Sequence, residues 1–132
     1  MHTSKRDYWL IGAAAVALVF GLLTVASGGR ALFGSDAAKQ AAGAAVDFVL
    51  WFNFVAGFAY VVASVGLWSR RRWAVMLAAS IAVATLLVFA AFGVHVTSGG
   101  AYEARTVAAM ALRSLIWVSI AWLAYRRIGR TA

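Results

Sequence analysis

The chain has 132 residues, of which 64% are hydrophobic and 12% are charged, and its mean hydropathy is +0.87. Its formal net charge is +8, and it contains neither cysteine nor proline. This composition excludes a water-soluble globular domain, and the lack of cysteine excludes disulfides and thiolate metal sites.

Four apolar stretches of nineteen to twenty-two residues follow one another along the chain. A helix rises about 1.5 Å per residue, so each stretch is long enough to cross a hydrocarbon core of about 30 Å. A helix also satisfies its own backbone hydrogen bonds in lipid. The sequence therefore predicts an all-α polytopic membrane protein, a single domain over residues 1–132 with four transmembrane helices in an antiparallel up-down bundle. The predicted spans are Tyr8–Ser27, Phe48–Trp68, Trp73–Val94 and Val107–Tyr125.

The connections between the spans differ in length. The first, Gly28–Asp47, contains Ser35 as a candidate N-cap, followed by Asp36 and an alanine-rich run. An aspartate at the start of such a run favours a helix, so we expect a helical segment in this extracytoplasmic loop at about residues 35–47. The second connection, Ser69–Arg72, is short enough to force an antiparallel hairpin.

Small residues form helical stripes on three of the spans. Such stripes allow two helix backbones to approach closely, which favours association in lipid. We interpret them as packing faces. Their members are Ala13, Ala17 and Gly21 in the first span, Ala74, Ala78 and Ala82 in the third, and Asn53, Gly57, Tyr60 and Ser64 in the second.

Positive charge is concentrated on one side of the spans. Eight basic residues lie in the two tails and the second connection and are opposed only by Asp7, whereas three bases and three acids cancel in the other two connections. The positive-inside rule predicts that both termini are cytoplasmic, with Trp and Tyr belts on the same side. We expect a bacterial cytoplasmic (inner) membrane, anionic lipids at the cytoplasmic face and no nucleic-acid partner. The eight bases are Lys5, Arg6, Arg70, Arg71, Arg72, Arg126, Arg127 and Arg130.

Polar residues near or within the spans all fall in the predicted outer half. Arg113 lies about 10 Å inside the fourth span by helix rise, where a charge needs a protein or water partner. Candidate partners are Asp47, with Asn53 adding a hydrogen bond, or Glu103. Two interpretations stay open, a structural ion pair and a ligand-binding site. The candidate ligand or ion-pair residues are Asp47, Asn53, His95, Tyr102, Glu103 and Arg113.

His95 closes the third span and has more than one interpretation. It is either an interfacial histidine that is hydrogen-bonded near the headgroups, or a metal ligand together with Asp47 and Glu103, since imidazole and carboxylates suit zinc or iron. A haem would need a second copy of His95 at an oligomer interface, because His2 lies on the opposite side. We predict no cofactor for the single chain.

Two classes of function follow. The first is a non-catalytic accessory, assembly or scaffold subunit of a membrane complex, or a homo-oligomer, whose partners are other membrane subunits or the protein itself. The alternative is a small transporter, channel or ligand-binding bundle that uses the polar cluster around Arg113, Asp47, His95 and Glu103. No P-loop or serine–histidine–aspartate arrangement can be assembled, so no catalytic residue is predicted and we do not favour an enzyme.

Overall fold

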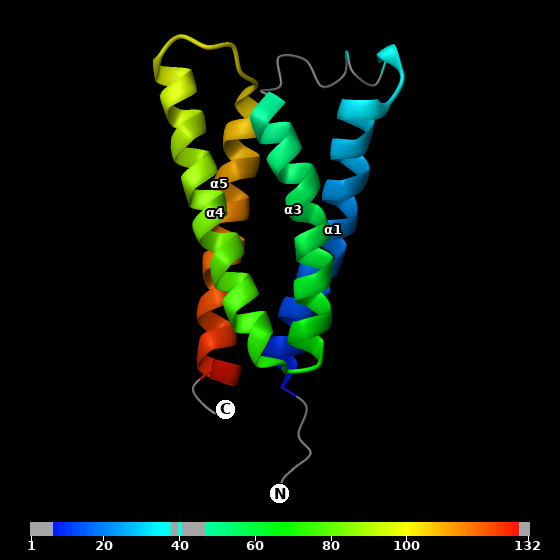
Figure 1. Cartoon of the computed structure of the whole chain (residues 1–132), viewed down its shortest axis with the longest axis vertical. Helices are drawn as coiled ribbons and strands as arrows, with labels where there is room; N and C mark the ends of the chain where they lie inside the picture. Colours follow the sequence, from blue (N-terminus) through cyan, green and yellow to red (C-terminus); the bar gives the residue numbers. More distant parts are fainter. Residues whose placement is uncertain (1–6, 38–39, 41–46, 130–132) are drawn as a thin grey trace, which may run out of the picture.

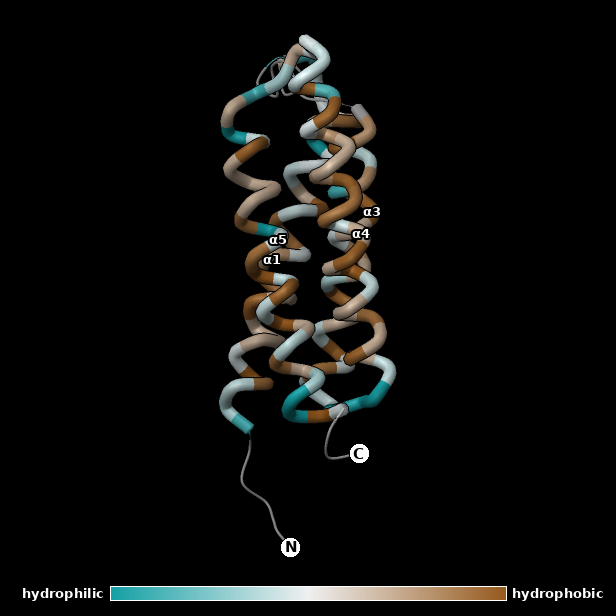
Figure 2. The backbone as a smooth tube through the Cα atoms, turned by 90° about the vertical axis from the view of Figure 1, so that its left-hand side faces the viewer, coloured by the Kyte–Doolittle hydropathy of each residue, from teal (hydrophilic) through white to brown (hydrophobic). Residues whose placement is uncertain are grey.

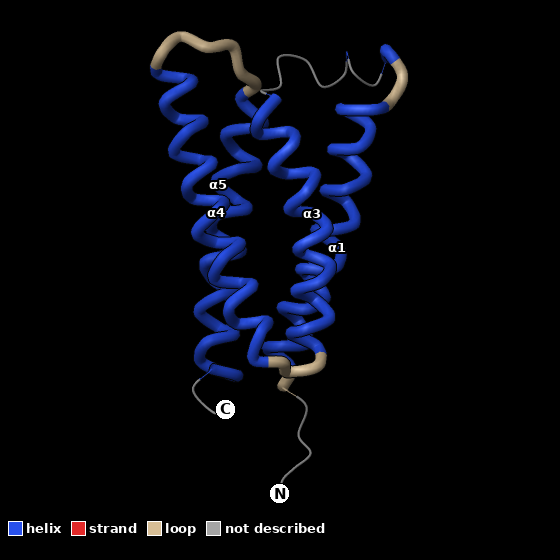
Figure 3. The backbone as a smooth tube through the Cα atoms, viewed as in Figure 1, coloured by secondary structure: helices blue, strands red, loops and turns tan. Residues whose placement is uncertain are grey.

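Four long helices make up most of the protein in a computed structural model, which describes residues 7–37, 40 and 47–129 (Figures 1 and 3). Each is long and apolar enough to cross a membrane, which confirms the prediction of four candidate transmembrane helices. The elements are α1 (Tyr8–Phe33), α3 (Asp47–Trp68), α4 (Arg72–Thr97), α5 (Ala104–Ala124) and the π-helical turn η1 (Tyr125–Gly129).

Helix α1 is longer than the predicted first span. It continues through Gly28 and ends at Phe33, where the N–H of Gly34 donates to the carbonyl oxygen of Arg30 at 3.0 Å. Gly28 does not end the helix because it packs against α3: a Cβ at this position would lie 3.2 Å from that of Phe54. The helical segment expected at 35–47 falls mainly on residues outside the described part of the chain.

Successive helices run in opposite directions, and the two ends of the described chain lie at the same end of the molecule (Figure 1). We call this end, which also holds the turn at Ser69–Arg71, the termini end. The opposite end, with the connections that follow Phe33 and Thr97, is the loop end. Hydrophobic residues dominate the middle of the helices (Figure 2).

The tightest contact in the molecule joins α1 to α3. Gly21 and Gly57 face each other there, and a Cβ on Gly21 would lie 2.9 Å from the carbonyl oxygen of Gly57. Ala13 and Ala17 continue the same buried face toward the termini end. The predicted packing role of this stripe is confirmed, since only small side chains allow the two backbones so close together.

Buried side chains form two groups along the length of the helices. The larger group fills the half nearer the termini end and includes Leu10, Tyr60, Leu67 and Trp117. A smaller group, Val49, Phe92 and Met110, joins α3, α4 and α5 nearer the loop end. The region between these groups, where α1, α3 and α5 face one another, contains the most buried charged side chain of the described residues.

We predict that Gly21→Ala destabilises the protein. The added methyl group meets backbone and not only a flexible side chain, so the helices must move apart, and overpacking of this kind costs about 1–3 kcal/mol. Gly93→Ala is the matched control, because nothing lies within 4 Å of a Cβ at Gly93. Thermal unfolding in mild detergent should show a lower midpoint for the first variant only. Equal midpoints would contradict the close approach of α1 and α3.

Candidate functional site

Arg113 lies near the middle of α5 with its side chain turned into the bundle, and only 8% of the residue is exposed. The inward direction follows from the pattern of α5, because Met110, Ser114 and Trp117 lie on the same buried face. A guanidinium stays charged under all ordinary conditions. The structure therefore places a permanent positive charge inside an apolar helix bundle.

The partners of Arg113 are neutral groups from α1 and α3. Its Nη1 donates to Thr24 Oγ1 at 3.0 Å and to the hydroxyl oxygen of Tyr60 at 3.4 Å. The guanidinium carbon lies 4.8 Å from the ring centre of Phe20, a cation–π arrangement. These contacts tie α5 to both helices of the α1–α3 pair, but none of them supplies a negative charge.

Aromatic rings form a layer beside Arg113, on the side toward the termini end. Phe20 stacks on Tyr60 with ring centres 5.7 Å apart, and Tyr60 meets Trp117 at 4.7 Å. Phe20 and Trp117 each lie one helical turn nearer the termini end than Thr24 and Arg113, respectively. The rings of Tyr60 and Trp117 are fully buried. We call these three rings, Phe20, Tyr60 and Trp117, the aromatic layer; they fill the interior of the bundle on the termini-end side of the guanidinium.

On the other side of Arg113, toward the loop end, lies a cavity of about 340 Å³, which we call the Arg113 cavity. Residues of α1, α3 and α5 form its wall, and more than half of the side chains in it are polar or charged. They are Thr24, Ser27, Gly28, Val49, Leu50, Asn53, Arg105, Thr106, Ala109 and Arg113.

Three buried polar atoms have no hydrogen-bond partner among the described residues: Arg113 Nε, Asn53 Oδ1 and Trp117 Nε1. Such atoms are rare in folded proteins, and each indicates a missing partner such as water or an ion. Asn53 and Arg113 both line the cavity, although their two unpartnered atoms are themselves buried from solvent. Of the predicted site residues, the structure brings these two together.

The predicted carboxylate partners of Arg113 have different outcomes. Glu103 pairs with Arg105 across 3.5 Å and lies ten residues before Arg113 on the chain, or about 15 Å by helix rise. The pairing of Arg113 with Glu103 is therefore not present. The other candidate, the side chain of Asp47, lies outside what the structure describes, and so does its predicted role in a metal site.

His95 and Tyr102 belong to the turn at the loop end. His95 Nε2 donates to the carbonyl oxygen of Ala101 at 2.9 Å, and its ring packs against Phe92 and Gly100. Tyr102 meets Phe92 edge-on at 6.3 Å. This hydrogen bond occupies Nε2 of the imidazole. In the described part of the chain, no three His, Cys, Asp or Glu side chains come together as a metal site would require. These contacts hold the turn between α4 and α5.

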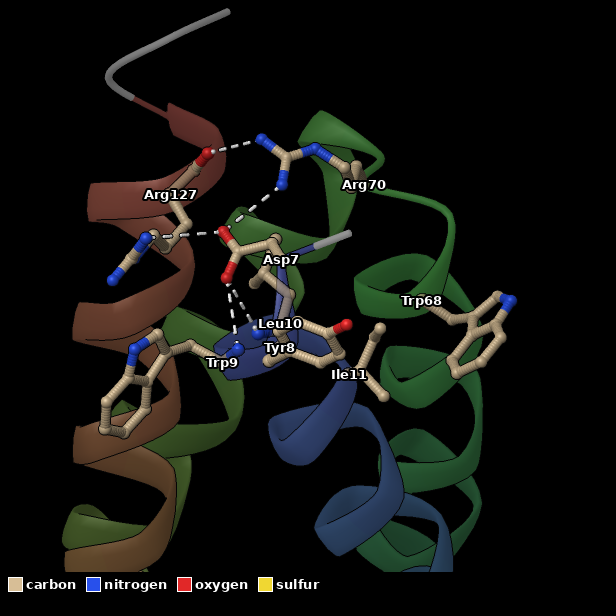
Figure 4. A pocket seen from close by; sticks show the side chains of 8 residues that line it. All are labelled: Asp7, Tyr8, Trp9, Leu10, Ile11, Trp68, Arg70 and Arg127. Atoms are coloured by element: carbon tan, nitrogen blue, oxygen red, sulfur yellow. Dashed lines mark hydrogen bonds and ion pairs between the residues drawn. The ribbon is translucent and has the colours of Figure 1, made fainter. Parts of the chain in front are cut away.

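A second polar centre surrounds Asp7 at the termini end (Figure 4). Asp7 Oδ1 accepts from the backbone N–H groups of Trp9 and Leu10 and so caps α1, while Oδ2 lies 3.3 Å from Arg70 Nη1 and 3.7 Å from Arg127 Nη1. Arg70 also donates to the carbonyl oxygen of Arg127 at 2.9 Å. The backbone φ of Arg70 is +54°, which is unusual for a residue other than glycine, and these bonds hold Arg70 in that conformation.

Asp7 thus joins the start of α1, the α3–α4 turn and the end of the chain's last helix. The sequence singled out Asp7 as the lone acid among eight bases, but it gave no signal that one carboxylate would link three segments so distant in the chain. Comparisons with protein-family models, curated proteins and solved structures found no match. The function is therefore argued from geometry alone.

We predict that Thr24→Val destabilises the protein by about 1–3 kcal/mol, because it removes the nearest oxygen from a buried charged donor while keeping the side-chain shape. Thr85→Val is the matched control. Thr85 is equally buried, but its hydroxyl donates only to the Ile81 carbonyl within its own helix, at 2.7 Å. Chemical or thermal unfolding of both variants measures the difference. A loss no larger than that of the control would mean that Arg113 does not depend on Thr24.

Proposed function

We propose that this protein is a membrane-embedded helix bundle that binds a small anion, a carboxylate or a phosphate, at Arg113. The single observation that carries the proposal is the buried guanidinium, which has only neutral partners among the described side chains and lies in the wall of a cavity that other polar side chains also line. This reading corresponds to the ligand-binding alternative and not to the accessory subunit that the sequence alone favoured.

Energetics support an anion. A charged side chain within the apolar part of a membrane protein is costly and normally has a partner of opposite charge or faces water. Hydroxyl oxygens and a ring face reduce this cost but do not neutralise the charge. An anion in the Arg113 cavity would supply a charge opposite to that of the guanidinium.

The lining of the cavity favours an oxyanion. A guanidinium presents its N–H donors in a planar fork that matches carboxylate and phosphate oxygens. Thr106 adds a hydroxyl to the wall, whereas the Ser27 hydroxyl donates to the carbonyl oxygen of Thr24 and Arg105 pairs with Glu103. At about 340 Å³ the cavity lies at the small end of the range for ligand pockets, roughly 300–1,000 Å³. A small ligand therefore fits better than a lipid or a peptide.

The aromatic layer limits what the site can do. Phe20, Tyr60 and Trp117 fill the bundle on the termini-end side of Arg113, so a ligand would reach the cavity from the loop end. Passage toward the termini end would require these rings to move. We therefore propose binding from one side as the primary activity, with transport only if the layer opens.

We further propose that the termini end faces the cytoplasm of a bacterial cell and that the loop end faces outward. The eight bases in the tails and the Arg70–Arg72 turn, against three at the loop end, support this orientation through the positive-inside rule. The Arg113 cavity would then be loaded from the outer side of the cytoplasmic membrane.

A second candidate is the non-catalytic subunit of a membrane complex or homo-oligomer. The hydrogen bonds from Arg113 to Thr24 and Tyr60 favour it, because they link three helices and would serve a purely structural role. In that case the cavity holds only water, and the functional surface is the one that contacts the partner subunits. Anion binding distinguishes the two candidates.

We expect sodium phosphate or sodium acetate to raise the unfolding midpoint of the detergent-purified protein above that in sodium chloride at equal ionic strength. A ligand present at 100 times its dissociation constant stabilises the folded state by about 2.7 kcal/mol. Arg113→Gln should abolish the rise, because the neutral amide supplies neither the charge nor the fork. Arg30→Gln, an equal change of charge at the exposed end of α1, should leave it intact.

Asn53→Leu gives a second test that keeps the bonds of Arg113. Leucine fills part of the cavity and removes the polar side-chain amide, so the variant should fold and yet lose the response to anions. An equal response in the wild type and in both cavity variants would mean non-specific salt effects. If neither anion stabilises the wild type, the structural role of Arg113 replaces the binding role.

The orientation has its own test. A reporter that is active only in the cytoplasm should be active when fused after Ala132 or inserted within Arg70–Arg72, and silent when inserted within Gly34–Gln40. Its activity follows from which side carries the bases. An active reporter at the loop end would reverse the proposed orientation.

A further inference from the structure

The seam between α1 and α5 is the most open helix boundary of the bundle. The two helices are neighbours but touch far less than the other adjacent pairs. Between them, on the half nearer the termini end, runs a groove of about 490 Å³. Its walls are almost entirely apolar, with Gly12, Ala13 and Val16 on one side and Leu115, Ile116 and Ile120 on the other.

The only hydroxyl well inside this groove is already used. Ser119 Oγ donates to the carbonyl oxygen of Leu115 in its own helix at 2.8 Å. The groove therefore offers an almost entirely hydrocarbon surface, with the exposed side chains of Tyr8 and Trp9 also lining it. An extended hydrocarbon chain is much thinner than a helix, which is about 10 Å across.

At the termini end the apolar groove meets a basic hollow. Trp9 and Leu123 line both spaces, so the two are adjacent. The hollow, of about 590 Å³, is also lined by three arginines, Arg70, Arg126 and Arg127, against one acid, Asp7. Asp7 is already engaged by Arg70 and Arg127, which leaves the hollow with a net positive charge.

Arg126 shows how this end could receive a headgroup. Its guanidinium lies 5.0 Å from the ring centre of Trp122, which orients it at the mouth of the hollow while its residue stays exposed. Trp9 is also exposed there, and tryptophan favours the headgroup level of a bilayer. Apolar walls that lead into a tryptophan-flanked set of arginines match the two parts of a phospholipid.

We propose that the α1–α5 seam is a binding site for a single phospholipid with an anionic headgroup. One acyl chain lies in the groove along Gly12 and Val16, and the phosphate lies at Arg126 and Arg127. The excess of arginine over aspartate favours an anionic lipid over a zwitterionic one, since each basic residue near the headgroup adds roughly the same increment of attraction. The site is separate from the Arg113 cavity, which lies toward the opposite end.

The test is native mass spectrometry of the full-length protein, released from detergent in the presence of phosphatidylglycerol or of phosphatidylcholine with the same acyl chains. We expect one retained phosphatidylglycerol per chain and markedly less phosphatidylcholine. Gly12→Leu should fill the groove without a clash, because nothing lies within 4 Å of a Cβ there, and should abolish retention. Arg126→Gln should weaken retention of phosphatidylglycerol about fivefold, as expected for one basic residue at the headgroup.

The matched controls are Gly93→Leu, also in open space but on α4, and Arg71→Gln, an exposed arginine at the same end that does not line the hollow. Both should retain lipid as the wild type does. Equal retention of the two lipids, or unchanged retention in Gly12→Leu, would overturn the proposal. A dimer that Gly12→Leu converts to a monomer would also overturn it, because a second copy of the chain would then cover the seam.

Discussion

The organisation of this bundle depends on the cost of holding one guanidinium inside an apolar interior. Arg113 cannot lose its charge, so the surrounding helices must bring polar groups to it. Thr24 and Tyr60 do so from two other helices, and Phe20 adds a ring face. These groups are neutral, and the anion site proposed for the adjacent cavity would supply the opposite charge.

The rest of the fold makes this arrangement feasible. Because Gly21 and Gly57 let α1 and α3 approach closely, Thr24 and Tyr60 reach the same guanidinium from adjacent backbones. Toward the termini end the rings of the aromatic layer pack against one another. Toward the loop end the Arg113 cavity is lined by several polar side chains. At the termini end, where most of the basic residues lie, Asp7 joins three segments of the chain. The Arg113 cavity lies toward the loop end.

The sequence predicted the four helices well because length and hydropathy alone decide them, and the small-residue stripe of α1 because its spacing reveals a packing face. It identified Arg113 and Asn53, but one of its two candidate partners, Glu103, pairs with Arg105 instead, since sequence position shows depth in a span but not which helices lie next to each other. Nothing in the sequence indicated that Thr24 and Tyr60 accept hydrogen bonds from Arg113, because a threonine or a tyrosine within an apolar run is common. Only the packing of α1 against α3 brings the two side chains together. The α1–α5 seam could not be predicted from the sequence either, because it lies between two helices that are distant in the chain.

The most direct measurement of the central claim is the resonance of the Arg113 Nε–H group in arginine-labelled protein during a titration with phosphate. In the structure this donor is buried and has no partner among the described residues. If an anion binds in the cavity, the resonance should move progressively and saturate, while those of exposed arginines such as Arg30 should move little. A resonance of Arg113 that stays fixed across the titration would contradict an anion site and leave the guanidinium as a structural tie alone.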